Sequence, residues 1–164
     1  MRTLFGAVLA FLIMLPLSLS AQETEEREGA IQAVGLFLGG TTKFKDGSEE
    51  TSFTLAGEYE YIGQNWGPWG VAGVVEIIFA HDLEYIIMPM AYYHPIDEAF
   101  IRAGVGLEVG SKNEEGRDAH LILRVGVGYS FEVGEGILLV PSFDIDGIRS
   151  DPAMAYGLVL AKEW

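Results

Sequence analysis

Strict alternation of side-chain character over residues 119–133 (AHLILRVGVGYSFEV) constrains this chain more than any other feature. One face carries only apolar and aromatic residues, and the other carries glycines and polar residues that include His120 and Arg124. A period of two places alternate side chains on opposite faces, which predicts a β-strand. The apolar row is long and ends in Tyr129 and Phe131 beside a turn, as in a strand that crosses a bilayer at a tilt. The stretch therefore predicts a transmembrane β-barrel.

The first 21 residues have the pattern of a secretory signal peptide. Arg2 precedes an apolar run from Leu4 to Leu15, and small residues follow, with cleavage expected after Ser20 or Ala21. This run is shorter than the about 20 residues that a membrane helix needs. Residues 22–29 (QETEEREG) are polar and charged, which predicts a short flexible periplasmic lead. Residues 30–164 then form one barrel domain.

Composition narrows the possible classes of protein. Hydrophobic residues make up 49% of the chain, yet no other stretch has the about 18 consecutive apolar residues of a membrane helix. Only helices and closed barrels satisfy backbone polar groups in lipid, so an exported apolar chain of this kind is a barrel or a soluble sheet protein. The chain has no cysteine, which excludes a disulfide framework. A net charge of −14 argues against a nucleic-acid partner.

Seven further segments read as strands, although their alternation varies in quality. The polar loops predicted at residues 39–50 and 110–118 alternate with short turns, and an even number of strands leaves both ends of the barrel in the periplasm. The fold predicted is an all-β, eight-stranded antiparallel up-and-down transmembrane barrel. Its strands are expected at about residues 30–38, 51–62, 69–80, 83–94, 99–109, 119–133, 137–146 and 153–164.

Proline 89 is the anomaly of the fourth strand, which also alternates poorly. Proline has no N–H to donate to a β-ladder, so Pro89 predicts either a bulge or a local gap in pairing.

Aromatic residues gather beside the short turns. Interfacial girdles of membrane barrels collect at such positions, whereas ordinary enrichment of aromatics in strands favours neither rim. The predicted girdle consists of Tyr59, Tyr61, Trp66, Trp69, Tyr92, Tyr93, Tyr129 and Phe131.

The signal segment, the eight alternating strands and the aromatic end of the chain together resemble the small outer-membrane barrels of the OmpA and OmpX kind. The resemblance implies a bacterial outer-membrane location, contact with outer-membrane lipid and lipopolysaccharide, and insertion by the barrel-assembly machinery. It also implies that the last strand carries the assembly signal. Lys162 departs from the pattern, which has an apolar residue there, although a lysine can snorkel to the interface. The signal residues are Tyr156, Gly157, Leu158, Leu160 and Trp164.

Ionisable residues on the predicted inner face form the one constellation with chemical content. An eight-stranded barrel is filled by side chains, so charges inside must be paired or hydrated. If the second polar loop is centred near Glu114, Glu108 lies opposite His120, and if the next turn is centred on Gly134, Arg124 lies opposite Asp144. The predicted inner face has more carboxylates than basic groups. The sequence therefore allows two interpretations, a lumen packed with salt bridges and a lumen that weakly favours cations. The predicted network contains Glu58, Glu60, Glu76, Arg102, Glu108, His120, Arg124, Asp144 and Asp146.

Two other functions remain open as alternatives. Outer-membrane lipid A acylases and deacylases need a serine or carboxylate beside a histidine at the outer rim, and His81 with Asp82 and Ser48, or His120 with Ser111, offer such types without a specific spacing. A soluble lipocalin-like carrier would instead be apolar inside and polar outside.

A non-enzymatic barrel without catalytic residues, metal or cofactor is the predicted function. It has a structural or interaction role at the cell surface, in which the acidic regions 39–50 and 110–118 meet outside partners. The sequence does not identify the extracellular ligand.

Overall fold

The computed structural model describes residues 29–45, 47–113, 116–148 and 152–164. The predicted signal peptide and all but the last residue of the lead lie outside the described residues. No helix in the described ranges is long and apolar enough to cross a membrane. The strands are β1 (Ile31–Lys45), β2 (Ser48–Ile62), β3 (Trp69–Phe79), β4 (Leu83–Ile96), β5 (Ala99–Asn113), β6 (Gly116–Tyr129), β7 (Phe131–Gly134), β8 (Ile137–Ile148) and β9 (Ala153–Glu163).

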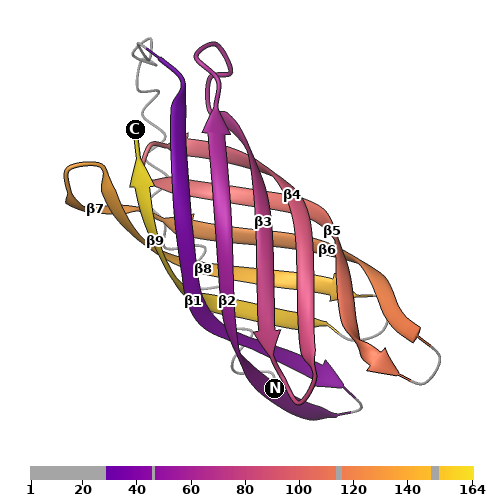
Figure 1. Cartoon of the computed structure of the whole chain (residues 1–164). Coiled ribbons are helices and arrows are strands. Elements are labelled where there is room, and N and C mark those ends of the chain that lie inside the picture. The colour runs from indigo at the N-terminus through magenta and orange to yellow at the C-terminus, as the bar shows by residue number, and fades with distance from the viewer. Residues whose placement is uncertain (1–28, 46, 114–115, 149–151) are drawn as a thin grey trace.

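The strands close into an antiparallel barrel (Figure 1). β1 pairs with both β2 and β9, while β8 pairs with β9 on one side and with β6 and β7 on the other. A break at Ser130, whose N–H donates to the carbonyl of Glu98, divides one strand of the barrel into β6 and β7. The prediction of eight antiparallel strands in a closed barrel is therefore confirmed.

The two ends of the barrel differ in shape. At one, which we call the turn end, short turns join β2 to β3, β4 to β5 and β7 to β8, and the chain terminus Trp164 lies beside Gln32. At the other, the hairpin end, β1 with β2 and β5 with β6 extend past their neighbours (Figure 1). For example, β3 first pairs with β2 at Phe53, although β2 begins at Ser48.

The prediction of long loops at residues 39–50 and 110–118 is wrong, because most of both regions is strand. β1 continues to Lys45 and β2 starts at Ser48, with Gly47 at a positive φ of 80° in the connection. Hydroxyl pairs across the ladder, Thr41 with Thr54 at 2.7 Å and Thr42 with Thr51 at 2.8 Å, stabilise this extension. The period of two persists through these polar residues, although the contrast in polarity that revealed it elsewhere is lost.

The faces of the barrel have the polarity of a membrane-spanning barrel. Leu121, Leu123 and Val125 point outward with 63%, 55% and 57% of their surface exposed, whereas Arg102 and Arg124 point inward with 4% and 3% exposed. A soluble carrier requires the opposite arrangement, so this structure overturns the lipocalin-like alternative. Apolar side chains over the outer surface are those of a barrel solvated by hydrocarbon.

Proline 89 sits on the outer face of β4 and produces a gap in pairing, not a bulge. Pairing of β4 with β5 is interrupted between Ile87 and Met90, while the register on both sides of the interruption is the same. On its other side Pro89 stays in register opposite Gly73 of β3. The missing N–H of Pro89 therefore removes backbone hydrogen bonds between β4 and β5 locally, and the register of the two strands does not change there.

Candidate functional site

The middle of the lumen contains two arginine clusters. In the first, Arg102 of β5 reaches across to Asp144 of β8, where Nε donates to Oδ1 at 2.8 Å and Nη2 donates to Oδ2 at 2.6 Å. Its Nη1 donates to Glu58 of β2 at 3.1 Å and to the hydroxyl oxygen of Tyr92 at 2.8 Å. One guanidinium thus joins four strands through charge-assisted hydrogen bonds.

The second cluster is centred on Arg124 of β6. Its Nε and Nη2 donate to the two oxygens of Asp146, each at 2.7 Å, and its Nη1 donates to Glu76 of β3 at 2.6 Å. All three side chains are almost completely buried. Such bidentate geometry suits arginine, because the planar fork matches the two carboxylate oxygens.

The predicted pairing of Arg124 with Asp144 is wrong by two residues. In the ladder Arg124 lies opposite Asp146, and Asp144 lies opposite Gly126. The prediction centred the connecting turn on Gly134, whereas the observed register is symmetric about Glu135, and moving a turn centre by one residue moves the register by two. Asp144 is consequently free to accept from Arg102, a pairing that was not predicted.

Glycine at position 126 makes room for the first cluster. A Cβ added there would lie 1.8 Å from Oδ1 of Asp144 and 3.0 Å from the carbonyl oxygen of Phe143. The side chain of Asp144 therefore occupies the space that any other residue at this position would fill.

A third ionic group lies toward the hairpin end and includes a cation that the sequence prediction missed. Nζ of Lys43 donates to Glu84 at 2.5 Å and to Glu108 at 2.7 Å. The sequence pattern ends the first predicted strand at Leu38, which leaves Lys43 in the predicted loop. Continuing its period of two from Ala33 would have placed Lys43 on the inner face.

The predicted opposition of Glu108 and His120 is confirmed by the register, but His120 does not lie in the enclosed lumen. Its side chain is exposed. The physical reason is the overhang of β6, whose pairing with β8 begins only at Ile122. His120 stands on the projecting part of the sheet, while Glu108 turns toward Lys43.

Apolar side chains separate the middle clusters from the Lys43 group. On β3 and β6 the next inward residues toward the hairpin end after Glu76 and Arg124 are Ile78 and Ile122. On β4 the next inward residues from Glu84 toward the turn end are Ile86 and Met88. At most 1% of the surface of each of these four apolar side chains is exposed. A layer of buried apolar side chains thus lies between two ionic groups of the lumen.

A small cavity of about 10 Å³ remains between the two arginine clusters. Glu76 and Asp144 line it, and Oε1 of Glu76 is a buried oxygen with no hydrogen-bond partner in the described structure. The space is that of about one water molecule. Across the described ranges, no group of three or more histidine, cysteine or acidic side chains is arranged to hold a metal ion.

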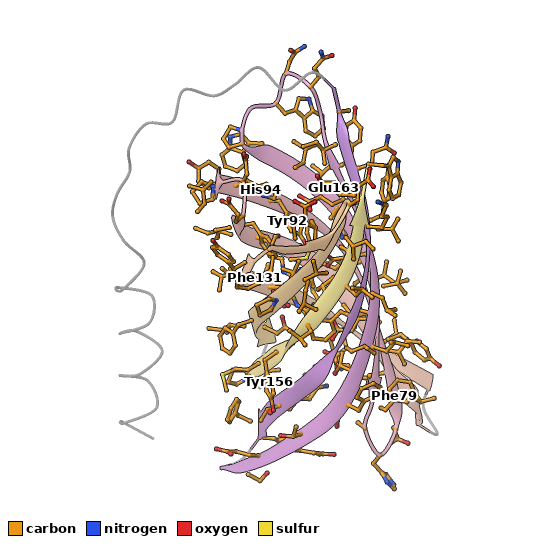
Figure 2. The ribbon with its side chains drawn as sticks, turned by 90° about the vertical axis from the view of Figure 1, so that its left-hand side faces the viewer. Phe79, Tyr92, His94, Phe131, Tyr156 and Glu163 are labelled. Carbon is orange, nitrogen blue, oxygen red and sulfur yellow. The ribbon has the colours of Figure 1, made fainter. Side chains whose placement is uncertain are left out.

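At the turn end, Oε1 of Glu60 accepts a hydrogen bond from Nε2 of His94 at 2.8 Å, in the ring tautomers that carry a proton on Nε2. The His94 ring lies 6.0 Å from the rings of both Tyr92 and Phe100. Figure 2 shows His94 and Glu163 toward this end of the barrel, and Phe79 and Tyr156 toward the other. Glu60 therefore belongs to a separate site and not to the arginine clusters.

The prediction that Tyr92 belongs to the aromatic girdle is wrong. Its side chain is fully buried and holds Arg102 inside the lumen. β4 is apolar on both faces, so its polarity did not reveal which residues point inward. The terminal polar residues Glu84 and His94 carry that signal, since both share the parity of Tyr92.

The other predicted girdle residues lie on the outer side near the turn end, where several rings pair. Trp69 and Tyr93 lie 4.9 Å apart, as do Tyr129 and Phe131, and Trp66 packs edge-on against Tyr61 at 5.5 Å. Tyr59 is exposed and its hydroxyl donates to Gln32. A second set of exposed aromatics, not predicted, lies toward the hairpin end and consists of Phe53, Phe79, Tyr85 and Tyr156.

The residues considered for catalysis are not assembled into a triad in the described structure. His81 and Asp82 are exposed in the turn between β3 and β4. The hydroxyl of Ser48 donates to the carbonyl of Lys45 at 2.6 Å. The side chain of Ser111 lies outside the described residues.

The last strand closes the barrel against β1. In the expected assembly signal, Tyr156, Leu158, Leu160 and Trp164 are exposed, while a Cβ at Gly157 would meet the carbonyl oxygen of Leu38 at 2.4 Å. Lys162, which departs from the apolar pattern, donates to the carbonyl of Glu135 at 2.6 Å. It ties the end of the chain to the turn before β8.

Comparisons with solved structures agree with this architecture. Neisserial surface protein A superposes with a TM-score of 0.62 at 12% identity, covering 81% of this chain and 95% of that one. The N-terminal β-barrel domain of Pseudomonas aeruginosa OprF gives 0.63 at 17% identity, covering 83% and 98%. Ail, the attachment invasion locus protein of Yersinia pestis, gives 0.61 at 14% identity, covering 84% and 99%.

This chain has the fold of the small eight-stranded outer-membrane barrels. No protein-family model and no curated protein matches it. At these identities the likeness shows the fold alone.

Proposed function

We propose that this protein is a non-enzymatic barrel of a bacterial outer membrane, exported with a cleaved signal peptide, with a structural or interaction role at the cell surface. The observation that carries the proposal is the polarity of its faces. Rows of exposed leucine and valine side chains cover the outside of the barrel, and the arginine side chains inside it are almost completely buried. Such an exterior is stable in hydrocarbon and would aggregate in water.

Fractionation of a Gram-negative expression host tests the location. The protein is expected in the outer-membrane fraction, shortened by about 21 residues as the signal-peptide pattern predicts, and to migrate differently on gels before and after boiling. Recovery from the soluble periplasm would overturn the proposal. Unaltered lipid A after overexpression is expected, and a changed acylation pattern would favour the enzymatic alternative.

Insertion by the barrel-assembly machinery is part of the same proposal. The outward residues of β9, Tyr156, Leu158, Leu160 and Trp164, are available to it before the barrel closes. Substituting Trp164 with serine is expected to reduce the assembled, heat-modifiable fraction in cells. Refolding of the purified variant in detergent provides the control, because it requires no machinery.

A lumen closed to ions fits the layers described above better than a cation-favouring passage. Planar-bilayer recordings of the natural sequence are expected to show no steady conductance. Substituting both Met88 and Ile122 with glycine removes two members of the apolar layer and is expected to admit ions. The matched control replaces outward-facing Ile87 and Leu123 with glycine. Steady conductance of the unaltered protein would contradict a closed lumen.

A further inference from the structure

A second cavity lies at the turn end of the barrel. Its volume is about 320 Å³, which is within the size range of small-molecule sites. The exposed side chains of Asp97, Glu98 and Glu132 line it, so it reaches solvent at the rim. Glu58, which also accepts from Arg102, lines it too and marks where it meets the first arginine cluster.

The walls of this cavity are apolar over much of their extent. Ile62, Phe100 and Val140 are buried core residues that line it, together with Leu138 and Ala161. The Phe100 ring packs directly over Gly128, in the space that a Cβ at this position would occupy. A ligand here would therefore bury an apolar body against fixed side chains of three or more strands.

The charge at the mouth has one sign. Among the described residues that line the cavity, the acidic and basic side chains are all carboxylates except His94. The His94 ring can become positive, and it is hydrogen-bonded to Glu60. Arg102, which contacts Glu58 from inside the barrel, also donates to Asp144 and Tyr92. An apolar cavity with an acidic mouth is complementary to a cation that carries an apolar group.

We propose that this cavity binds a small amphipathic organic cation, with its ammonium or guanidinium group among the rim carboxylates and its apolar body against Phe100 and Val140. The site opens at the turn end, so its ligand comes from that side of the membrane. The proposal does not depend on the identity of partners at the hairpin end.

Three matched probes test it, namely benzylamine, benzyl alcohol and benzoate, titrated into the refolded barrel in lipid nanodiscs and followed by amide chemical shifts. The compounds share one ring and differ in charge. Saturable shifts at the turn end are expected for benzylamine, with weaker binding of benzyl alcohol and none of benzoate. Equal binding of all three, or no saturable shift with benzylamine, would overturn the proposal.

Two sets of variants locate the site. Substituting Glu98 and Glu132 with glutamine keeps the shape and removes two charges, so benzylamine is expected to bind more weakly by about three- to tenfold, as for exposed ion pairs. The control substitutes Glu49 and Glu50 with glutamine at the hairpin end, which changes the net charge equally. Equal weakening by both pairs would show a general charge effect and would reject a site at this cavity.

The variant Val140→Phe fills the cavity without changing charge. The variant is expected to abolish the contribution that the aromatic ring of the probe makes to the binding affinity. Its amide spectrum away from the turn end reports whether the barrel is intact. An intact barrel that binds benzylamine as before would place the ligand elsewhere.

Discussion

Carboxylate side chains occur both in the middle of the lumen and at its turn end, but they differ in burial and in hydrogen-bond partners. In the middle, Asp144 and Asp146 are each held by two hydrogen bonds from an arginine, and the free space is about 10 Å³. At the turn end, Glu98 and Glu132 line a cavity of about 320 Å³ and are exposed. The carboxylates of Asp144 and Asp146 are therefore held by arginine, whereas the exposed side chains of Glu98 and Glu132 can be reached by a ligand from solvent.

Burial is the physical cause of this difference. A buried charge must be paired, because the loss of its hydration is not otherwise offset. Charges at the rim keep their hydration and contribute little to stability when they pair. This difference predicts that removing one charge lowers the free energy of unfolding strongly in the middle of the lumen and weakly at the turn end.

The largest effect is expected for Arg124→Met. It leaves the buried carboxylates of Asp146 and Glu76 without their donor, which should lower the free energy of unfolding by about 3–5 kcal/mol. Urea unfolding of the refolded barrel in lipid vesicles, followed by tryptophan fluorescence, measures it. The control Arg124→Lys keeps the charge but not the fork, and it should lose less. A loss under 1 kcal/mol for Arg124→Met would refute the contrast between the two regions.

Gly126→Ala should follow, with a loss of about 3 kcal/mol, because its Cβ displaces the Asp144 carboxylate from Arg102. Gly73→Ala is the matched control. A Cβ at Gly73 meets nothing within 4 Å, so the change there should stay within about 0.5 kcal/mol. Equal effects of the two substitutions would show that Asp144 can be repositioned freely.

Glu60→Gln tests the turn end itself. It removes the charge that faces His94 but leaves an amide that can still hydrogen-bond the ring, so the loss should be about 1 kcal/mol. The same urea titration compares it directly with Arg124→Met. A larger loss than that of Arg124→Met would reverse the order of the two regions.

Lys162→Ala should have the smallest effect, about 0.5 kcal/mol, since the hydrogen bond to the carbonyl of Glu135 is exposed. Exchange of the Glu163 amide hydrogen, which bonds to the carbonyl of Gly136, should become faster as the end of β9 loosens. Unchanged exchange would show that Lys162 does not hold this corner.

Much of the barrel follows from the amino-acid sequence. Alternation around Leu121 and Leu123 fixes which face meets hydrocarbon, because a period of two leaves only two assignments and burying Arg124 in lipid is far costlier than burying it in a filled lumen. The number of strands follows from the same pattern. Around Tyr92 both faces of the strand are apolar, and around Lys43 both are polar. In these places polarity does not distinguish the two faces, so the prediction of which residues point inward fails.

Pairing partners inside the lumen were decided only by the tertiary structure. A turn centre displaced by one residue changed the neighbour of Arg124 from Asp144 to Asp146, and Arg102 meets Asp144 across the lumen and not along a ladder. Where the two faces of a strand differ in polarity, the sequence by itself determined the direction in which each side chain points, since that depends on local backbone geometry. Closure of the barrel determined what each side chain meets, because contacts across a lumen depend on the register and tilt of all the strands together.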